Sequence, residues 1–328
     1  MKQLTPFDIS PGLSGRELLE QMEGTSFGAR ALGHAWSVLR SVLCDSQCRV
    51  LLTVSGALSV AQLGGIFHGM LVRNILHAVC TTGAVVTHQL VQELGFKQFQ
   101  LPEGTNDASL AQQHLHRIYD SIEPETNLSA LERFVAEKAS EFTGALGSAD
   151  IIRRLASALA NPTGWLAESV RQSVPVFAPA LTDSELGLAL YSTSGPAQER
   201  RFYFDPMADL DEVAAWLRSQ ERIAVITLGG GVPRNWAMQM IPFLRSHGER
   251  TLPRIVAGIR ICPDPAAYGH LSGSTFSEAT TWGKIHPQDL SNFAEVMGDA
   301  TIIFPVLMLA AFEAIEASKQ VPHPPPAL

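Results

Sequence analysis

The stretch RIAVITLGGGVPRNWAMQM, residues 222–240, decides the fold. It begins with an apolar run of strand length, continues through Gly229, Gly230 and Gly231, and ends in a helical pattern. Glycines allow backbone N–H groups to approach a phosphate closely, and the N-terminus of the following helix adds favourable partial charge. The glycines could equally serve only a tight turn that needs positive φ angles. Because the spacing is not G-x-G-x-x-G, the stretch predicts a strand–loop–helix unit without identifying a dinucleotide site.

The rest of the chain repeats this alternation of short apolar strands and amphipathic helices. Such alternation is typical of a mainly parallel sheet that helices cover on both faces. We therefore predict one large α/β domain at 26–317, after an N-terminal arm (1–25) and before a flexible, Pro-rich tail (318–328). Strands are expected at 49–56, 77–86, 174–181, 200–206, 222–228, 254–261 and 299–305. Helices are expected at 63–76, 128–142, 149–160 (ended by Asn161-Pro162), 209–219, 236–245 and 306–318.

The composition is that of an ordinary globular protein with a net charge of −8. This charge argues against a nucleic-acid-binding protein, which usually carries a basic face. The N-terminus lacks the apolar core of a signal peptide, and we expect no apolar run of the length of a membrane span, so we expect a cytoplasmic protein. We expect free cysteine thiols and no metal site, since neither Cys44 and Cys48 nor His114 and His116 have further ligands at a suitable spacing.

One lysine has an unusual setting. The chain has five lysines, and only Lys284 lies among small, hydroxyl and aromatic residues, in SGSTFSEATTWGKIHP (272–287). A pocket of this kind would destabilise the ammonium by desolvation, and the neutral amine could then form an imine. Glu278, six residues earlier, could offset the charge or hold a cationic substrate. The alternative is a surface lysine whose stem packs on Trp282.

Polar residues also gather where other predicted strands end. In a parallel sheet, ligands bind beyond the carboxyl ends of the strands. Small and hydroxyl residues follow the strands in SGALS (55–59), TTGAV (81–85) and APALTDSELG (178–187). Asp183 could bind a ribose hydroxyl or cap the next helix, and Asp299, which precedes Ala300, has the same two alternatives.

Taken together, these motifs resemble deoxyhypusine synthase and its bacterial relatives. They occur in the family's order and span the chain from about residue 50 to residue 305. The matching segments are TTGA (81–84), RIYD (117–120), PVFAPALTD (175–183), LGGGVPRNW (228–236), SEATTWGKI (277–285) and GDATIIFP (298–305).

The resemblance implies a Rossmann-like fold, an NAD cofactor and a homotetramer with active sites at subunit interfaces. It implies that a 4-aminobutyl group passes from a polyamine to an active-site lysine as an imine, and then to an acceptor amine. Lys284 falls on the position of that lysine, and Asn235 stands where the family has a proton-transferring histidine. The positions that the resemblance assigns to the cofactor are Ser55, Thr81, Thr82, Gly83, Asp183, Gly229, Gly230, Gly231, Asp299 and Ala300.

The substrate side departs from the family pattern. Glu278 is retained, but Leu188, Tyr268 and Leu271 stand where the family has aspartates, and His88 stands where it has a glutamate. Losing three carboxylates weakens a site for a tri-cation, so we expect a small amine acceptor, as in homospermidine formation or agmatine condensation. Spermidine, putrescine and agmatine are the candidate substrates, with substrate contacts expected from Glu278, Trp282, Tyr268 and His88. The alternatives are a true deoxyhypusine synthase and a non-catalytic NAD-binding homologue.

Overall fold

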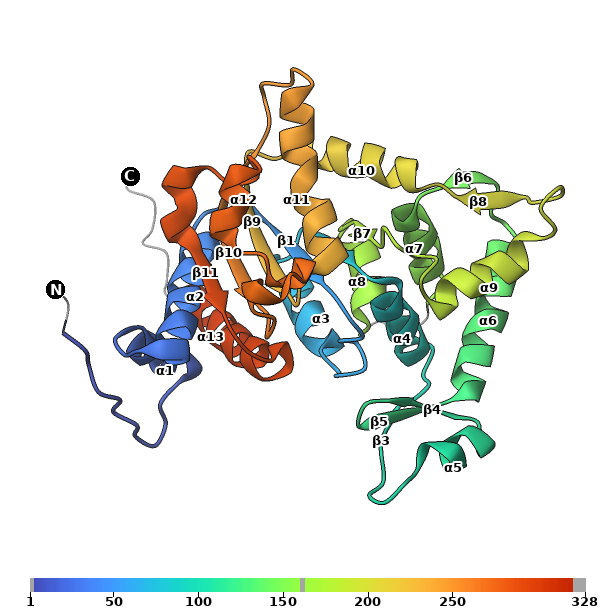
Figure 1. The fold of residues 1–328 in the computed structure, drawn as a ribbon, viewed down its shortest axis with the longest axis horizontal. Coiled ribbons are helices and arrows are strands. Elements are labelled where there is room, and N and C mark those ends of the chain that lie inside the picture. The colour runs from blue at the N-terminus through green and yellow to red at the C-terminus, as the bar shows by residue number, and fades with distance from the viewer. Residues whose placement is uncertain (1–2, 160–162, 321–328) are drawn as a thin grey trace.

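The computed structural model describes residues 3–159 and 163–320, and its centre is a six-stranded parallel sheet (Figure 1). The strand order is β11-β10-β9-β1-β2-β7, and every neighbouring pair is parallel. Starting from β1, the chain adds two strands on one side and then three on the other, which is the Rossmann order. The expected α/β fold is therefore confirmed. The strands are β1 (Cys48–Val54), β2 (Ala78–Thr81), β7 (Val176–Phe177), β9 (Arg222–Leu228), β10 (Arg254–Ile261) and β11 (Phe293–Val296).

Helices cover both faces of this sheet. Alternate residues of β1 point to opposite sides, so that Val50 and Leu52 enter one hydrophobic core and Leu51 enters the other. The first core lies under α2, α3 and α13, and the second lies under α10, α11 and α12. The helices are α1 (Gly15–Glu23), α2 (Phe27–Leu43), α3 (Gly64–Val72), α4 (Gly83–Glu93), α5 (Asp107–Gln112), α6 (Glu125–Ala139), α7 (Ser148–Ser157), α8 (Trp165–Arg171), α9 (Glu185–Ser194), α10 (Pro206–Arg218), α11 (Gly231–Ser246), α12 (Phe276–Thr281) and α13 (Ala300–Gln320).

Two small sheets lie outside the main one. β3 (Phe99–Gln100), β5 (Ser121–Pro124) and β4 (Leu115–Ile118) form an antiparallel layer beyond α4 (Figure 1). β6 (Gly144–Leu146) pairs with β8 (Phe202–Phe204). The strand expected at 200–206 is thus present in part, but it belongs to this two-stranded ladder.

The strand expected at 299–305 is wrong, because α13 already begins at Ala300. The β-branched run Thr301-Ile302-Ile303 favours a strand locally, but Asp299 starts a helix. Its Oδ1 accepts a hydrogen bond from the Thr301 amide (2.8 Å), and its carbonyl accepts one from the Ile303 amide (3.1 Å). The last strand of the sheet is instead β11, a short segment with no strong apolar signal.

Because a strand was predicted at 299–305, the helix α13 was predicted too short, at 306–318. Residues Ala300–Ser318 form a helix long and apolar enough to cross a membrane, with a mean hydropathy of 1.8, which corrects the expectation that no apolar run has this length. One face of α13 joins the core through Phe304 and Leu307. Its Glu313 accepts hydrogen bonds from the amides of Gly15 (3.3 Å) and Arg16 (2.9 Å). α13 therefore packs on the domain along one face, and 33% of its apolar window is buried.

Part of the N-terminal segment packs against α13 and α2. Residues 3–14 are mostly exposed and lack regular structure, whereas α1 buries Leu19 completely against the domain. The segment expected as an arm thus ends in a helix that contacts α2 and α13. Asn161-Pro162 and most of the Pro-rich tail lie outside the described residues.

Candidate functional site

The centre of the site is the point where the strand order reverses, between β1 and β9. The Ser55 hydroxyl, just after β1, donates to the Leu228 carbonyl (3.3 Å) and accepts from the Gly230 amide (3.0 Å). These bonds tie the exit of β1 to the glycine loop that leads into α11. The loop predicted from residues 222–240 therefore lies at the usual ligand position of this fold.

Glycine is required at the three positions of this loop for different physical reasons. Gly229 has a φ of 80°, and a Cβ there would lie 2.1 Å from Ser55 Oγ. A Cβ on Gly230 would lie 2.6 Å from Ser272 Cα. Gly231 also has a positive φ (66°), but its missing Cβ would meet nothing within 4 Å. The first two glycines allow close packing of the chain, and only Gly231 leaves open space.

The other candidate cofactor residues lie at the same edge of the sheet. Thr81 is buried, and its hydroxyl donates to the Val54 carbonyl. Thr82 begins α4 and donates to the Gly56 carbonyl (2.8 Å). Gly83 is required because a Cβ would lie 2.3 Å from the Ser184 hydroxyl oxygen.

The two aspartates follow β7 and β11. Asp183 is exposed, and it is Ser184, not Asp183, that caps α9 by accepting from the Gly187 amide (3.2 Å). The Asp183 carboxylate therefore remains available beside Gly83. Asp299 is exposed and caps α13, and Ala300 beside it is buried.

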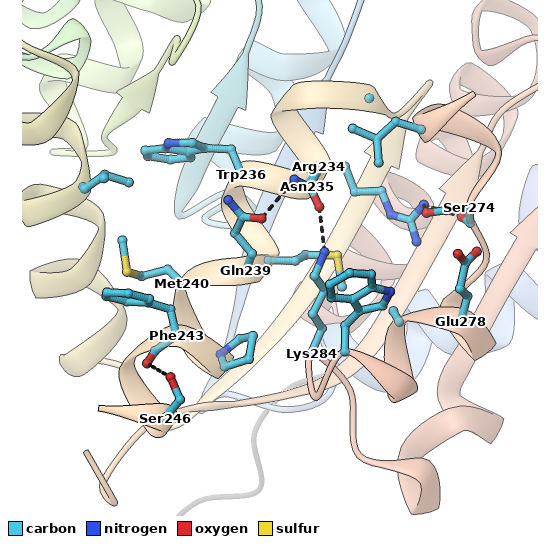
Figure 2. Close-up of a pocket in the computed structure, with 17 residues that line it drawn as sticks. Arg234, Asn235, Trp236, Gln239, Met240, Phe243, Ser246, Ser274, Glu278 and Lys284 are labelled. Carbon is cyan, nitrogen blue, oxygen red and sulfur yellow. Dashed lines mark hydrogen bonds between the residues drawn. The ribbon is translucent and has the colours of Figure 1, made fainter. Parts of the chain in front are cut away.

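Lys284 lies in a pocket of ≈ 680 Å³ between α11 and α12. Its Nζ donates to Asn235 Oδ1 (2.7 Å), and Asn235 Nδ2 donates to Gln239 Oε1 (3.0 Å), as Figure 2 shows. A turn at Gly283, with a φ of 67°, brings the lysine back toward α11. The pocket extends to Gly231, so the lysine and the open end of the glycine loop share one cavity.

The charges around Lys284 favour its neutral form. Burial lowers the pKa of this lysine, the positive charge of Arg234 lowers it further, and the Glu278 carboxylate acts in the opposite direction. The amine accordingly has the environment of a nucleophile rather than that of a surface lysine.

The two sides of the pocket differ in character. Arg234, Ser274 and Glu278 lie to the right of Lys284 in Figure 2, and Trp236, Met240 and Phe243 lie to its left. Trp236 also packs on the buried Phe177, with ring centroids 5.4 Å apart. One half of the pocket can thus hold a polar or charged group, and the other half can hold an apolar one.

The structure brings together only some of the predicted substrate residues. Lys284, Asn235, Glu278 and Trp282 all line this pocket. His88 does not: it lies on α4, and its Nδ1 is 2.7 Å from Glu123 Oε2 of the outer antiparallel layer.

Tyr268 is also outside the pocket. It is 71% exposed and lies in a short 3₁₀ turn next to His270. Neither Tyr268 nor His88 therefore reaches the Lys284 pocket within one chain. No metal-binding cluster of His, Cys, Asp or Glu occurs among the described residues.

Arg234 and Gln239 also line the pocket, although neither was predicted as a site residue from the sequence. Gln239 could have been found, because it follows Asn235 by four residues and so shares its face of α11. Arg234 gives no such signal, since adjacent helical residues diverge and its burial depends on the distant 272–276 segment.

Comparison with known proteins places this chain in a family. The deoxyhypusine synthase family model matches residues 17–311. The chain is 30% identical over 288 residues to probable deoxyhypusine synthase 2 of Archaeoglobus fulgidus, covering 87% of this chain and 94% of the relative. It is 26% identical to the deoxyhypusine synthase-like protein of Chlorobaculum parvum, covering 88% of this chain and 84% of the relative.

The fold agrees with a solved structure. A crystal structure assigned as a deoxyhypusine synthase from Entamoeba histolytica matches with a TM-score of 0.63 and 15% identity, covering 95% of this chain and 98% of that chain. The chain therefore belongs to the deoxyhypusine synthase family, whose NAD-dependent members transfer an aminobutyl group from spermidine.

Proposed function

We propose that this protein is an NAD-dependent transferase that moves a 4-aminobutyl or guanidinobutyl group from a polyamine, through a Lys284 imine, to a small amine acceptor. The observation that carries this proposal is the position of Lys284: a half-buried amine, with a neutral hydrogen-bond partner, in a cavity that reaches the glycine loop. Within the family's chemistry, such an amine suits imine formation.

The residues at the sheet edge fit a dinucleotide. Gly231 lacks a side chain where space is open, and Asp183 and Asp299 present exposed carboxylates after β7 and β11, the two outer strands of the sheet. We assign NAD to the edge formed by Ser55, Thr81, Thr82, Gly83, Asp183, Gly229, Gly230, Gly231, Asp299 and Ala300. When bound there, NAD supplies hydride removal from the carbon beside a polyamine nitrogen and the later return of that hydride.

The reaction of the chain itself is an exchange of nitrogen atoms. The neutral amine of Lys284 adds to the C=N carbon of the oxidised donor. A new C–N bond to Nζ forms, and the bond to the departing amine breaks as that nitrogen takes up a proton. Attack by the acceptor amine reverses these steps and frees Lys284. Asn235 orients the lysine by accepting its N–H, and Glu278 binds the distal ammonium of the substrate.

The charges of the pocket support a small acceptor. Glu278 is the one carboxylate among the residues that line it, and Leu271 lines it where the family has an aspartate. A pocket with one carboxylate offsets one ammonium and leaves a second in contact with apolar walls. This favours putrescine or agmatine as the acceptor.

We further propose a cytoplasmic homotetramer with active sites at subunit interfaces. In such an assembly the exposed Tyr268, and the apolar half of the pocket, would face another subunit. Trp282, which is 68% exposed, would there contact the substrate cation through its ring face.

The test is to trap the imine. The protein is incubated with NAD and, separately, with spermidine, putrescine or agmatine, reduced with borohydride, and mapped by mass spectrometry. We expect a four-carbon amine or guanidine adduct on Lys284 with at least one of these donors, and none in Lys284→Arg. If no amine gives an adduct although NAD binds, the protein is a non-catalytic NAD-binding homologue.

A second candidate is a true deoxyhypusine synthase, which the names of the archaeal relatives favour. It predicts that label from spermidine passes to a lysine of the translation-factor acceptor protein. Offering that protein and putrescine together distinguishes the two: label in homospermidine supports the small acceptor, and label in the protein supports the second candidate.

A further inference from the structure

Arg234 is a buried cation without an ion-pair partner. Its side chain is 4% exposed, and no Asp or Glu of the described residues lies within 4.0 Å of its guanidinium. Nη1 donates to the Ser274 carbonyl (2.6 Å), and the guanidinium lies 4.8 Å from the centroid of the Phe276 ring. Figure 2 shows the group extending from α11 toward Ser274, beside Glu278. Burying a charge without an ion-pair partner costs free energy, so the presence of Arg234 at this position needs an explanation.

The neighbouring Arg260 is a buried arginine whose charge is compensated by an ion pair. Arg260 is 5% exposed, but it pairs with Glu295 (2.5 Å) and donates to the Ser272 carbonyl (2.9 Å). Both arginines thus hold the 272–274 segment through carbonyl groups. Only Arg260 forms an ion pair, whereas Glu295 and Glu278 act on Arg234 without an ion-pair contact. Holding this segment therefore does not by itself explain why Arg234 is left unpaired.

The charge of Arg234 acts on Lys284 because both side chains line the same pocket. Two cations in a partly desolvated space repel each other more strongly than they do in water. The partner of the Lys284 amine is the Asn235 amide, which adds no compensating charge.

We propose that Arg234 is a positioning residue whose charge, which has no ion-pair partner, adds to burial in favouring the neutral, nucleophilic form of the Lys284 amine. This proposal rests on the proposed role of Lys284 as the imine-forming residue. Arg234 touches no reacting atom and acts only through the lysine. Because Arg234 lies in the first turn of α11 and directly precedes Asn235, this turn supplies both the orientation and the electrostatic setting of the amine.

The other charged groups around Lys284 do not cancel this effect. Glu278, on α12, opposes Arg234 but is exposed, so solvent screens it more strongly. Arg245, on α11, donates a hydrogen bond to the Gly283 carbonyl (3.1 Å) and is a cation, so it does not offset the charge of Arg234. Asp289, which follows in the next turn, is paired with Arg254 (2.7 Å).

An arginine suits this task because it stays protonated when buried. Burial and the charge of Arg260 lower the pKa of Arg234 to about 10, which still leaves it charged at neutral pH. A lysine in the same place would begin from a lower pKa and would lose more of its charge on burial.

The test measures the protonation of Lys284 without substrate or NAD. Isotope-labelled formaldehyde and cyanoborohydride methylate only neutral amines, and peptide mapping follows the rate at Lys284 as a function of pH. In Arg234→Gln we expect the midpoint of this rate to move to higher pH, and the rate well below the midpoint to fall by about threefold or more. In Glu278→Gln we expect the opposite direction. Lys138, on α6, serves as an internal reference in every sample.

A purely structural role for Arg234 would not move the two midpoints in opposite directions. An unchanged midpoint in folded Arg234→Gln overturns the proposal, and so does a shift to lower pH. If Arg234→Gln fails to fold, Arg234→Met removes the same charge with a side chain suited to an apolar site. The methylation assay needs no polyamine, so its result does not depend on whether the transfer reaction occurs. Conversely, an unchanged midpoint would not affect the result of imine trapping on Lys284.

Discussion

Lys284 and His88 occupy two regions that treat a basic side chain in different ways. Lys284 is half-buried, and its hydrogen-bond partner is a neutral amide. His88 is 7% exposed, and its partner Glu123 is a carboxylate that is 1% exposed. The second arrangement fastens α4 to the outer antiparallel layer by a compensated pair. The first leaves the base without a carboxylate as its hydrogen-bond partner, and the exposed Glu278 offsets its charge only in part. A base with a buried counter-ion stabilises structure, whereas one without it keeps its reactivity.

The largest expected effect comes from removing the reactive amine. In Lys284→Ala we expect the rate of amine transfer to fall by roughly 10³-fold or more, because no other lysine lines the pocket. The midpoint temperature of thermal unfolding should be unchanged or slightly raised, since a half-buried amine near Arg234 is removed. Product formation is measured by chromatography of the amines. Retention of full activity would remove Lys284 from the mechanism.

A second change gives the pocket the chemistry of the His88 region. In Asn235→Asp a carboxylate replaces the amide that lies 2.7 Å from Nζ, so the ammonium form of Lys284 is stabilised. We expect the transfer rate at neutral pH to fall by about tenfold or more, with recovery as the pH is raised. The matched control is Gln239→Glu, one hydrogen bond further from the lysine, which should have a smaller effect in the same direction.

The reverse change removes the compensation of His88. In Glu123→Gln we expect the free energy of unfolding to fall by about 1–3 kcal/mol, because a buried hydrogen-bonded charge is lost from a network that includes Asn127 and Gln98. Urea unfolding measures the loss. Transfer activity per folded molecule should stay the same. A tenfold loss of activity without loss of stability would instead place His88 in contact with the substrate.

The sequence allows one of these regions to be predicted much better than the other. Lys284, Asn235 and Glu278 come from two short segments that match the family's motifs, so the resemblance was enough to predict that they share a site. His88 was assigned to the substrate by alignment with the same family, at a position where the family has a glutamate. Its orientation is decided by Glu123, which belongs to an outer layer without a recognisable pattern. Arg234 was missed because its burial depends on Phe276 and Ser274, residues that are far from it in sequence.

The fold shows the same limit. The long runs at 222–228 and 254–261 were predicted as strands with their bounds, because both are mostly apolar and have the length of a buried strand. The run at 299–305 failed because one capping aspartate outweighs a local β-branched preference. β11 was missed because it is short, and its pairing with β10 supplies what its sequence does not.

The smallest expected effect is the pH dependence of the His88 region. Burial alone would raise the pKa of Glu123, but the hydrogen bond and charge of His88, with the amides of Asn127 and Gln98, lower it below its ordinary value of 4.5. The unfolded chain therefore binds this proton more readily, and stability is lost as the pH falls below 4.5 through the folded pKa.

Other buried carboxyls complicate a direct measurement of this loss. Burial raises the pKa values of Glu93 and Asp209, so their contributions run the other way and are lost as the pH rises. The difference between the wild type and Glu123→Gln removes these shared terms. We expect the two free energies of unfolding, followed by urea titration, to converge as the pH falls below 4.5. A gap that stays constant would mean that Glu123 acts through its shape and hydrogen bonds, and not through a charge paired with His88.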